Sequence, residues 1–213
     1  MKITFSGIID KVKYKKEDNR TIVAIIDYKT GSVDVDLKTI PYGIGMQLPV
    51  YLYLAHNTNK LENIEVAGFY LQHILNNEVV VEKNKSYEEE KKKGLLLQGY
   101  SNNNIDILST FDNSYTKSNM IKSLCMTKDD KFYSYSKVLS SKQMEHLKDI
   151  AEENINKAAE EISSAQFTIA PKKIGDINYG CRYCNYKDIC FHSNEDIVEL
   201  EELSKEEVLG GEE

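Results

Sequence analysis

Two acidic residues and a lysine near the N-terminus have types and spacing that suit hydrolytic chemistry. Asp27 and Lys29 lie in the segment Asp-Tyr-Lys-Thr-Gly over residues 27–31, which directly follows an apolar run. Asp10 ends a second, similar run. Carboxylate oxygens hold Mg²⁺ or Mn²⁺, and such a metal ion activates water and neutralises charge on a phosphate. These three residues are therefore the first candidates for a catalytic site.

An antiparallel hairpin would bring the three residues together. The polar residues 15–20 separate the two β-type runs, as a hairpin turn does. If the turn centres on Asp18 and Asn19, opposed residues have numbers that add up to 37, and Asp10 lies directly opposite Asp27. Lys29 shares their face because side chains alternate along a strand. Opposed like charges are destabilising, so the pair needs a cation, either a metal ion or an ordinary salt-bridge partner at a solvated hairpin end.

Three motifs together resemble the RecB-like branch of the PD-(D/E)xK nucleases. They are Gly-x-x-Asp over residues 7–10, the Asp-Tyr-Lys-Thr-Gly segment, and a Gln-x-x-x-Tyr pattern that begins at residue 47. The resemblance implies an α/β fold with a restriction-endonuclease-like core, in which helices flank a mixed sheet. A C-terminal cysteine turn would be added to this core.

The resemblance also implies a role for each motif residue. In the family, the two aspartates and the backbone carbonyl after the second one hold Mg²⁺ or Mn²⁺. The lysine orients the attacking water or stabilises the transition state. The glutamine and tyrosine contact DNA or brace the lysine, although ordinary polar residues beside a core would have the same pattern. The matching residues of this chain are Asp10, Asp27, Tyr28, Lys29, Gln47 and Tyr51.

Three clustered cysteines indicate a metal site near the C-terminus. Cys181, Cys184 and Cys190 offer soft thiolates at close spacing, which suits a [4Fe–4S] cluster or zinc. Following a long predicted helix, they resemble the iron–sulfur staple in the AddB subunit of the bacterial AddAB helicase–nuclease. This resemblance runs from about residue 5 to residue 192. The remaining cysteine, Cys125, is expected to be a small buried apolar residue.

The resemblance to the helicase–nuclease subunit implies a larger context. It predicts an AddA-type partner subunit, DNA as substrate, cleavage of the 5′-ended strand and a role in double-strand-break repair by recombination. Family members also carry a histidine or glutamate metal ligand on a helix upstream of the first aspartate, and a fourth cysteine further upstream. We expect both to be missing from this chain, the cluster to be absent or incomplete, and nuclease activity to be weak.

Composition limits the class of protein. A chain of 213 residues with 41% hydrophobic and 29% charged residues fits one soluble domain with a real core. Cysteine usage and the lack of a long apolar run predict a cytoplasmic protein with no membrane segment. Of the net charge of −7, residues 194–213 hold −8, so the rest carries +1. Such a charge gives little hold on DNA, so other subunits are expected to bind the strand.

The chain divides into a nuclease domain over residues 1–193 and an acidic tail over residues 194–213. Within the domain we expect an insertion over about residues 76–139 and a cysteine staple over residues 171–192. Helical patterns cover residues 41–55 and 140–166, and a third strand covers residues 64–74. The second helix begins with a capping-box pattern, Ser140 and Gln143.

Two other readings remain open from the sequence. The chain could be a free-standing RecB-like nuclease of the CRISPR-associated kind, which also has three C-terminal cysteines. It could also be a non-catalytic DNA or protein interaction module on a nuclease fold. The joint presence of Asp10, Asp27 and Lys29 argues against the second reading, because a buried charge is costly without a purpose.

Overall fold

A computed structural model describes residues 3–31, 34–74, 79–81, 83 and 86–210 of the protein. The chain forms two compact units. The first comprises residues 6–35 and 47–149, and the second comprises residues 1–5, 36–46 and 150–213. Within the part of the chain that is described, no helix is both long and apolar enough to span a bilayer.

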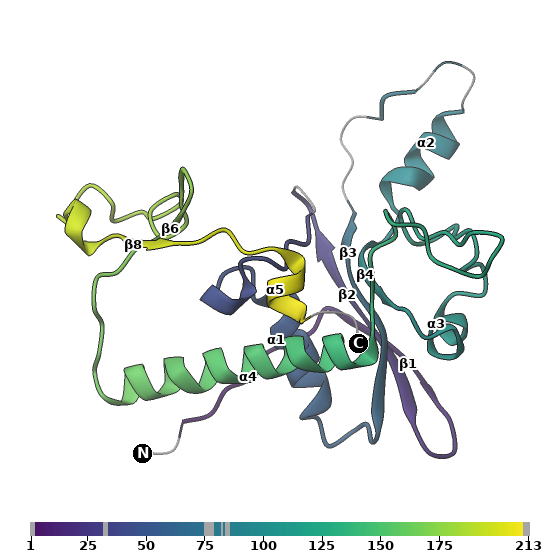
Figure 1. The fold of residues 1–213 in the computed structure, drawn as a ribbon, viewed down its shortest axis with the longest axis horizontal. Coiled ribbons are helices and arrows are strands. Elements are labelled where there is room, and N and C mark those ends of the chain that lie inside the picture. The colour runs from purple at the N-terminus through teal and green to yellow at the C-terminus, as the bar shows by residue number, and fades with distance from the viewer. Residues whose placement is uncertain (1–2, 32–33, 75–78, 82, 84–85, 211–213) are drawn as a thin grey trace. The chain divides into compact units, whose positions relative to one another are not determined.

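The first unit is built on a mixed five-stranded sheet with the order β1-β2-β3-β4-β5 (Figure 1). Pairing alternates along the sheet: β1 is antiparallel to β2, β2 parallel to β3, β3 antiparallel to β4, and β4 parallel to β5. The expected mixed α/β core is therefore confirmed. The strands are Lys11–Lys16 (β1), Thr21–Lys29 (β2), Ile64–His73 (β3), Gln98–Asn102 (β4) and Val138–Leu139 (β5).

The hairpin β1–β2 has the register expected from its sequence. Lys11 lies opposite Ile26, and each further pair has residue numbers with the same sum. The backbone N–H of Glu17 donates to the carbonyl of Arg20 at 2.8 Å and closes the turn. Extended by one residue beyond β1, this register places Asp10 opposite Asp27.

Among the described residues, the α-helices that belong wholly or partly to the first unit are Gln47–His56 (α1), Tyr87–Gly94 (α2), Ile105–Phe111 (α3) and the N-terminal part of Ser141–Ser163 (α4). Helix α3 packs against β2, β3 and β4, and α1 packs against β2 and β3. The core between the sheet and α3 includes Ile22, Ala24, Ile26, Tyr70 and Leu108.

Helix α1 begins later than predicted, at Gln47 rather than at residue 41. Residues Ile40–Tyr42 form a short 3-10 helix, and Gly43 and Gly45 have φ angles of 74° and 71°. This left-handed backbone suits glycine and interrupts the helical pattern. Pro49 lies in the first turn of α1, where its missing N–H leaves no intrahelical bond unmade.

The segment expected to be an insertion, about residues 76–139, contributes to the central sheet. Its strands β4 and β5 and its helix α3 belong to the first unit, and the longest stretch between its elements is residues 112–137. The part over residues 75–78, 82 and 84–85 lies outside the described residues. In the sequence, this segment shows short apolar stretches between Asn-rich turns. That pattern is the same for strands of the central sheet and for strands of an inserted subdomain.

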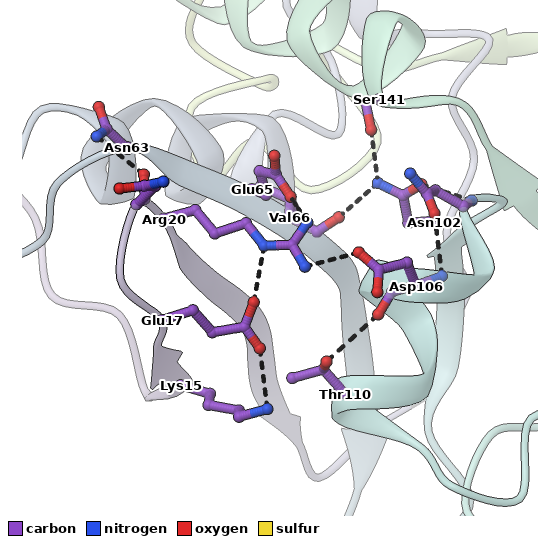
Figure 2. Close-up of polar contacts among 12 residues, drawn as sticks. Lys15, Glu17, Arg20, Asn63, Glu65, Val66, Asn102, Asp106, Thr110 and Ser141 are labelled. Atoms are coloured by element: carbon purple, nitrogen blue, oxygen red, sulfur yellow. Dashed lines mark hydrogen bonds and ion pairs between the residues drawn. The ribbon is translucent and has the colours of Figure 1, made fainter.

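An ion-pair cluster around Arg20 holds the turn of the hairpin (Figure 2). The Arg20 guanidinium donates to Glu17 at 2.8 Å, to Glu65 on β3 at 2.9 Å and to Asp106 on α3 at 2.6 Å. Asn104 caps α3 by accepting from the backbone N–H of Asp106 at 3.0 Å. One guanidinium therefore joins the hairpin turn to β3 and α3.

Substitution of Arg20 is expected to loosen this joint in a pH-dependent way. The hydrogen bond from Lys15, together with that from Arg20, lowers the pKa of Glu17. Stability gained from this shift is present above the ordinary glutamate pKa and is lost as the pH falls through the lowered one. Arg20→Met should lower the Tm at neutral pH, and the difference from wild type should shrink below about pH 4. Arg182→Met, at an exposed arginine of the other unit, is the control. Equal Tm losses in the two variants would contradict a stabilising role of the Arg20 ion-pair cluster.

The second unit contains the C-terminal part of α4 and a small sheet with the order β7-β6-β8. Its further elements are Lys172–Ile174 (β6), Ile177–Asn178 (β7), Val198–Leu200 (β8) and Lys205–Leu209 (α5). The acidic C-terminal segment contains regular structure, because β8 pairs with β6 and α5 follows it.

The capping box of α4 is confirmed: Ser140 and Gln143 each accept the other's backbone N–H, at 3.2 and 3.0 Å.

Candidate active site

The candidate site lies where the C-terminal end of β2 meets the first turns of α1. Burial of the apolar run of β2 carries its next residue, Asp27, into the interior, where it is 1% exposed. Burial of an ionised carboxylate is costly unless charges and hydrogen bonds compensate for it. The surroundings of Asp27 therefore decide what this site can do.

Three other predicted side chains meet around this carboxylate. Oδ1 of Asp27 accepts from Nε2 of Gln47 at 2.8 Å and from the hydroxyl of Tyr51 at 3.3 Å. The ammonium of Lys29 lies 2.6 Å from Oδ2 of Asp27 and also donates to Oε1 of Gln47. Since Gln47 and Tyr51 are one helical turn apart, α1 presents both to the same point on β2.

Oδ2 of Asp27 is buried, and no donor among the described residues makes a well-directed hydrogen bond to it. Lys29 lies at short range from this oxygen but lacks the angle of a hydrogen bond. The ammonium still neutralises the carboxylate, because charge attraction depends on distance far more than on angle. With the ammonium displaced, Oδ2 would be a suitable ligand for a hard cation.

Asp10 lies beside β2 but is bound differently. Its Oδ2 accepts the backbone N–H of Tyr28 at 3.0 Å, and the residue is exposed. Among the described residues, no three His, Cys, Asp or Glu side chains gather as a metal site. The donors left for a metal ion are the two motif carboxylates, together with the Tyr28 carbonyl that the sequence motifs predicted. This set fits Mg²⁺, which commonly binds through one or two carboxylates, water and substrate phosphates.

Residues 1–191 match the sequence profile of the PD-(D/E)XK nuclease superfamily. The chain belongs to this superfamily. It is similar to the AddB subunit of the ATP-dependent helicase/deoxyribonuclease of Carboxydothermus hydrogenoformans, with 31% identity over 89% of this chain and 18% of the relative. The corresponding subunit of Alkaliphilus metalliredigens is 31% identical over 98% of the chain and 19% of the relative, and that of Bacillus cereus is 28% identical over 100% and 20%.

The chain thus spans about one fifth of the length of these relatives. It is a nuclease-superfamily domain, and its fold and its motif positions agree with that assignment. The activities in the relatives' names belong to much longer proteins.

Close packing explains why a glycine suits position 7, the first residue of the Gly-x-x-Asp motif in this PD-(D/E)XK domain. A Cβ atom on Gly7 would lie 2.8 Å from Cδ1 of Leu54 on α1. A side chain at this position would require the end of the Leu54 side chain to shift on the helix that carries Gln47 and Tyr51. The glycine of the Gly-x-x-Asp motif therefore lets the Asp10 segment approach α1.

The motifs did not reveal Lys11, the residue next to Asp10. Its ammonium donates to the hydroxyl of Tyr28 at 2.9 Å and lies 5.5 Å from the centroid of that ring. The only sequence signal was the alternation of lysines at positions 11, 13 and 15 of β1. The motifs pointed to the backbone of Tyr28, whereas its side chain has a partner of its own.

The three clustered cysteines lie in the second unit of the domain, where each is a half-buried free thiol. Sγ of Cys181 lies 3.7 Å from Nε2 of His192, but no three metal-ligating side chains gather in the part of the chain that is described. In this arrangement the residues do not fit a [4Fe–4S] cluster. Cys125 belongs to the first unit and is half-buried, not fully buried as expected.

Proposed function

We propose that this chain is the metal-dependent DNA nuclease domain of a helicase–nuclease. The observation that carries the proposal is the buried Asp27 carboxylate, whose Oδ2 has the Lys29 ammonium 2.6 Å away but no well-directed hydrogen bond. A structural ion pair would be expected to satisfy both oxygens. The superfamily match and the names of the relatives support the same activity.

In this proposal Asp10, Asp27 and the Tyr28 carbonyl hold Mg²⁺ or Mn²⁺. The bound ion would polarise the scissile phosphate and lower the pKa of a coordinated water. Lys29 has an ammonium beside the same carboxylate, from which it can orient the attacking water or stabilise charge on the phosphate.

Gln47 bridges the two charged groups in the proposed mechanism. Its amide nitrogen donates to Asp27, and its oxygen accepts from Lys29. The Tyr51 hydroxyl lies 3.0 Å from the same amide nitrogen and fixes the orientation of the glutamine. We therefore assign Gln47 and Tyr51 as positioning residues, which keep the lysine and the aspartate in one geometry.

The larger context is also part of the proposal. The relatives' names support a helicase/deoxyribonuclease made of more than one subunit. The proposal adds that the partner is an AddA-type helicase subunit and that the complex degrades the 5′-ended strand during recombinational repair of double-strand breaks. The free cysteines suit a reducing compartment, so we place the protein in the cytoplasm. A [4Fe–4S] cluster on Cys181, Cys184 and Cys190 belongs to the full-length protein in this proposal.

The test is cleavage of DNA labelled at either its 5′ or its 3′ end, with Mn²⁺, Mg²⁺ or EDTA. We expect metal-dependent cleavage, weak for the chain alone because residues 1–193 carry a charge of only +1. The helicase–nuclease that contains this domain should degrade the 5′-ended strand. Absence of metal-dependent cleavage in both preparations would refute the proposal, and loss of the 3′-ended strand would refute the strand assignment.

The cysteines yield a separate prediction about colour and iron. The three thiolates do not gather among the described residues, and three ligands alone would leave a cluster open and prone to oxidation, so the purified chain should be colourless and contain no iron. Visible absorption and metal analysis measure this directly, and zinc is compatible with the expectation. A brown protein with about four irons per chain, lost on Cys125→Ser, would overturn it and make Cys125 a ligand.

A further inference from the structure

A second pair of side chains lies next to the candidate metal site. Lys11 directly follows Asp10, and Tyr28 directly follows Asp27, so their side chains project from the other face of the hairpin. There the ammonium of Lys11 donates to the hydroxyl of Tyr28 at 2.9 Å. Tyr28 remains 36% exposed, and β1 is the edge strand of its sheet, with no strand of the described residues paired to its outer side.

The charge of Lys11 is not neutralised by a carboxylate. Among the described residues, no acidic group lies within 4 Å of its ammonium, whereas Lys29 pairs with Asp27 and Lys15 pairs with Glu17 at 2.9 Å. The π face of Tyr28 offers the ammonium a weak attraction but no negative charge. A full positive charge therefore remains at the exposed edge of the sheet.

The hydroxyl of Tyr28 adds a second donor. Because its oxygen accepts from Lys11, its own proton is available to another acceptor. An ammonium and a hydroxyl side by side match two oxygens of one phosphate group. Such contacts hold a nucleic-acid backbone in place without reading its sequence.

We propose that Lys11 and the Tyr28 hydroxyl bind a phosphate of the DNA strand that is cleaved. The phosphate they bind is a neighbour of the scissile phosphate on that strand. The inference rests on the proposed function, because the scissile group is placed at Asp10 and Asp27. Each member of the pair is the chain neighbour of one of these aspartates. A phosphate held by the pair would keep the strand in register with the metal site, and the effect would appear in DNA binding.

The test compares Lys11→Ala with Lys16→Ala in the whole chain. Lys16 is an exposed lysine at the turn end of the same strand, so its substitution makes the same charge change about 17 Å away. Binding of a fluorescently labelled single-stranded oligonucleotide is followed by anisotropy at low ionic strength in EDTA, where no cleavage occurs. Circular dichroism confirms that each variant is folded.

We expect Lys11→Ala to weaken binding about 5-fold and to reduce the slope of log K against log salt by about 0.7, the value for one phosphate contact on a single strand. Lys16→Ala should leave both quantities near wild type, and Lys11→Arg should restore the slope. Tyr28→Phe, which keeps the ring and the backbone, should cause a smaller loss of affinity with an unchanged slope. Equal binding by the two alanine variants would overturn the inference and leave the Lys11–Tyr28 contact as packing only.

Failure of this inference can be told apart from failure of the proposed function. If the chain cleaves DNA with Mn²⁺ but Lys11→Ala binds like Lys16→Ala, only the phosphate site is wrong. If binding depends on Lys11 but no preparation cleaves DNA, the nuclease proposal fails. The pair would then bind a phosphate on a non-catalytic module.

Discussion

Asp27→Asn should reduce metal-dependent DNA cleavage on the order of 10³-fold, because it removes one charged metal ligand worth several kcal/mol in the transition state. The amide has nearly the same size as the carboxylate, and Gln47 and Tyr51 remain as neighbours. The loss should therefore arise from chemistry and not from unfolding. Single-turnover cleavage of end-labelled DNA by the helicase–nuclease that contains this domain measures it.

Two controls separate the active site from the rest of the enzyme. Asp18→Asn makes the same chemical change at an exposed position in the hairpin turn and should leave cleavage unchanged. ATP-driven unwinding by the Asp27→Asn complex should also be unchanged, because the chain contains no Walker-type nucleotide loop. Normal cleavage by Asp27→Asn would exclude this residue from the mechanism.

Lys29→Met should destabilise the fold by about 2 kcal/mol, because it leaves the Asp27 carboxylate buried without a compensating charge. We reduce the usual cost of breaking a buried pair, since the Lys29 side chain is 31% exposed. Asp27→Asn should be neutral or stabilising, because it removes the buried charge itself. The double variant should therefore be more stable than Lys29→Met alone.

Urea unfolding of the four proteins measures the coupling between the two residues. Lys16→Met, at an exposed lysine without an acidic partner among the described residues, is the matched control and should change stability by less than about 0.5 kcal/mol. If Lys29→Met is no worse than Lys16→Met, the pair is screened by solvent. Asp27 and Lys29 would then not be the buried, coupled charges on which the metal proposal depends.

Regularities that span few residues were predictable from the sequence. The alternation along β1 and β2 and the polar turn between them set the pairing of Lys11 with Ile26. The capping box at Ser140 and Gln143 set the start of α4. The onset of α1 was missed, because Gly43 and Gly45 adopt left-handed backbone that an apolar pattern does not reveal.

Contacts between distant segments were decided only by the tertiary structure. Arg20 pairs with residues 45 and 86 positions further along the chain, and no local pattern marks that cluster. The motifs named Asp27, Lys29 and Gln47, but their spacing could not show that one oxygen of Asp27 is buried without a directed donor. Nor could they show that Lys11 contacts the hydroxyl of Tyr28. Strand and helix periods relate residues up to about four positions apart, whereas burial and long-range pairing depend on how whole elements pack.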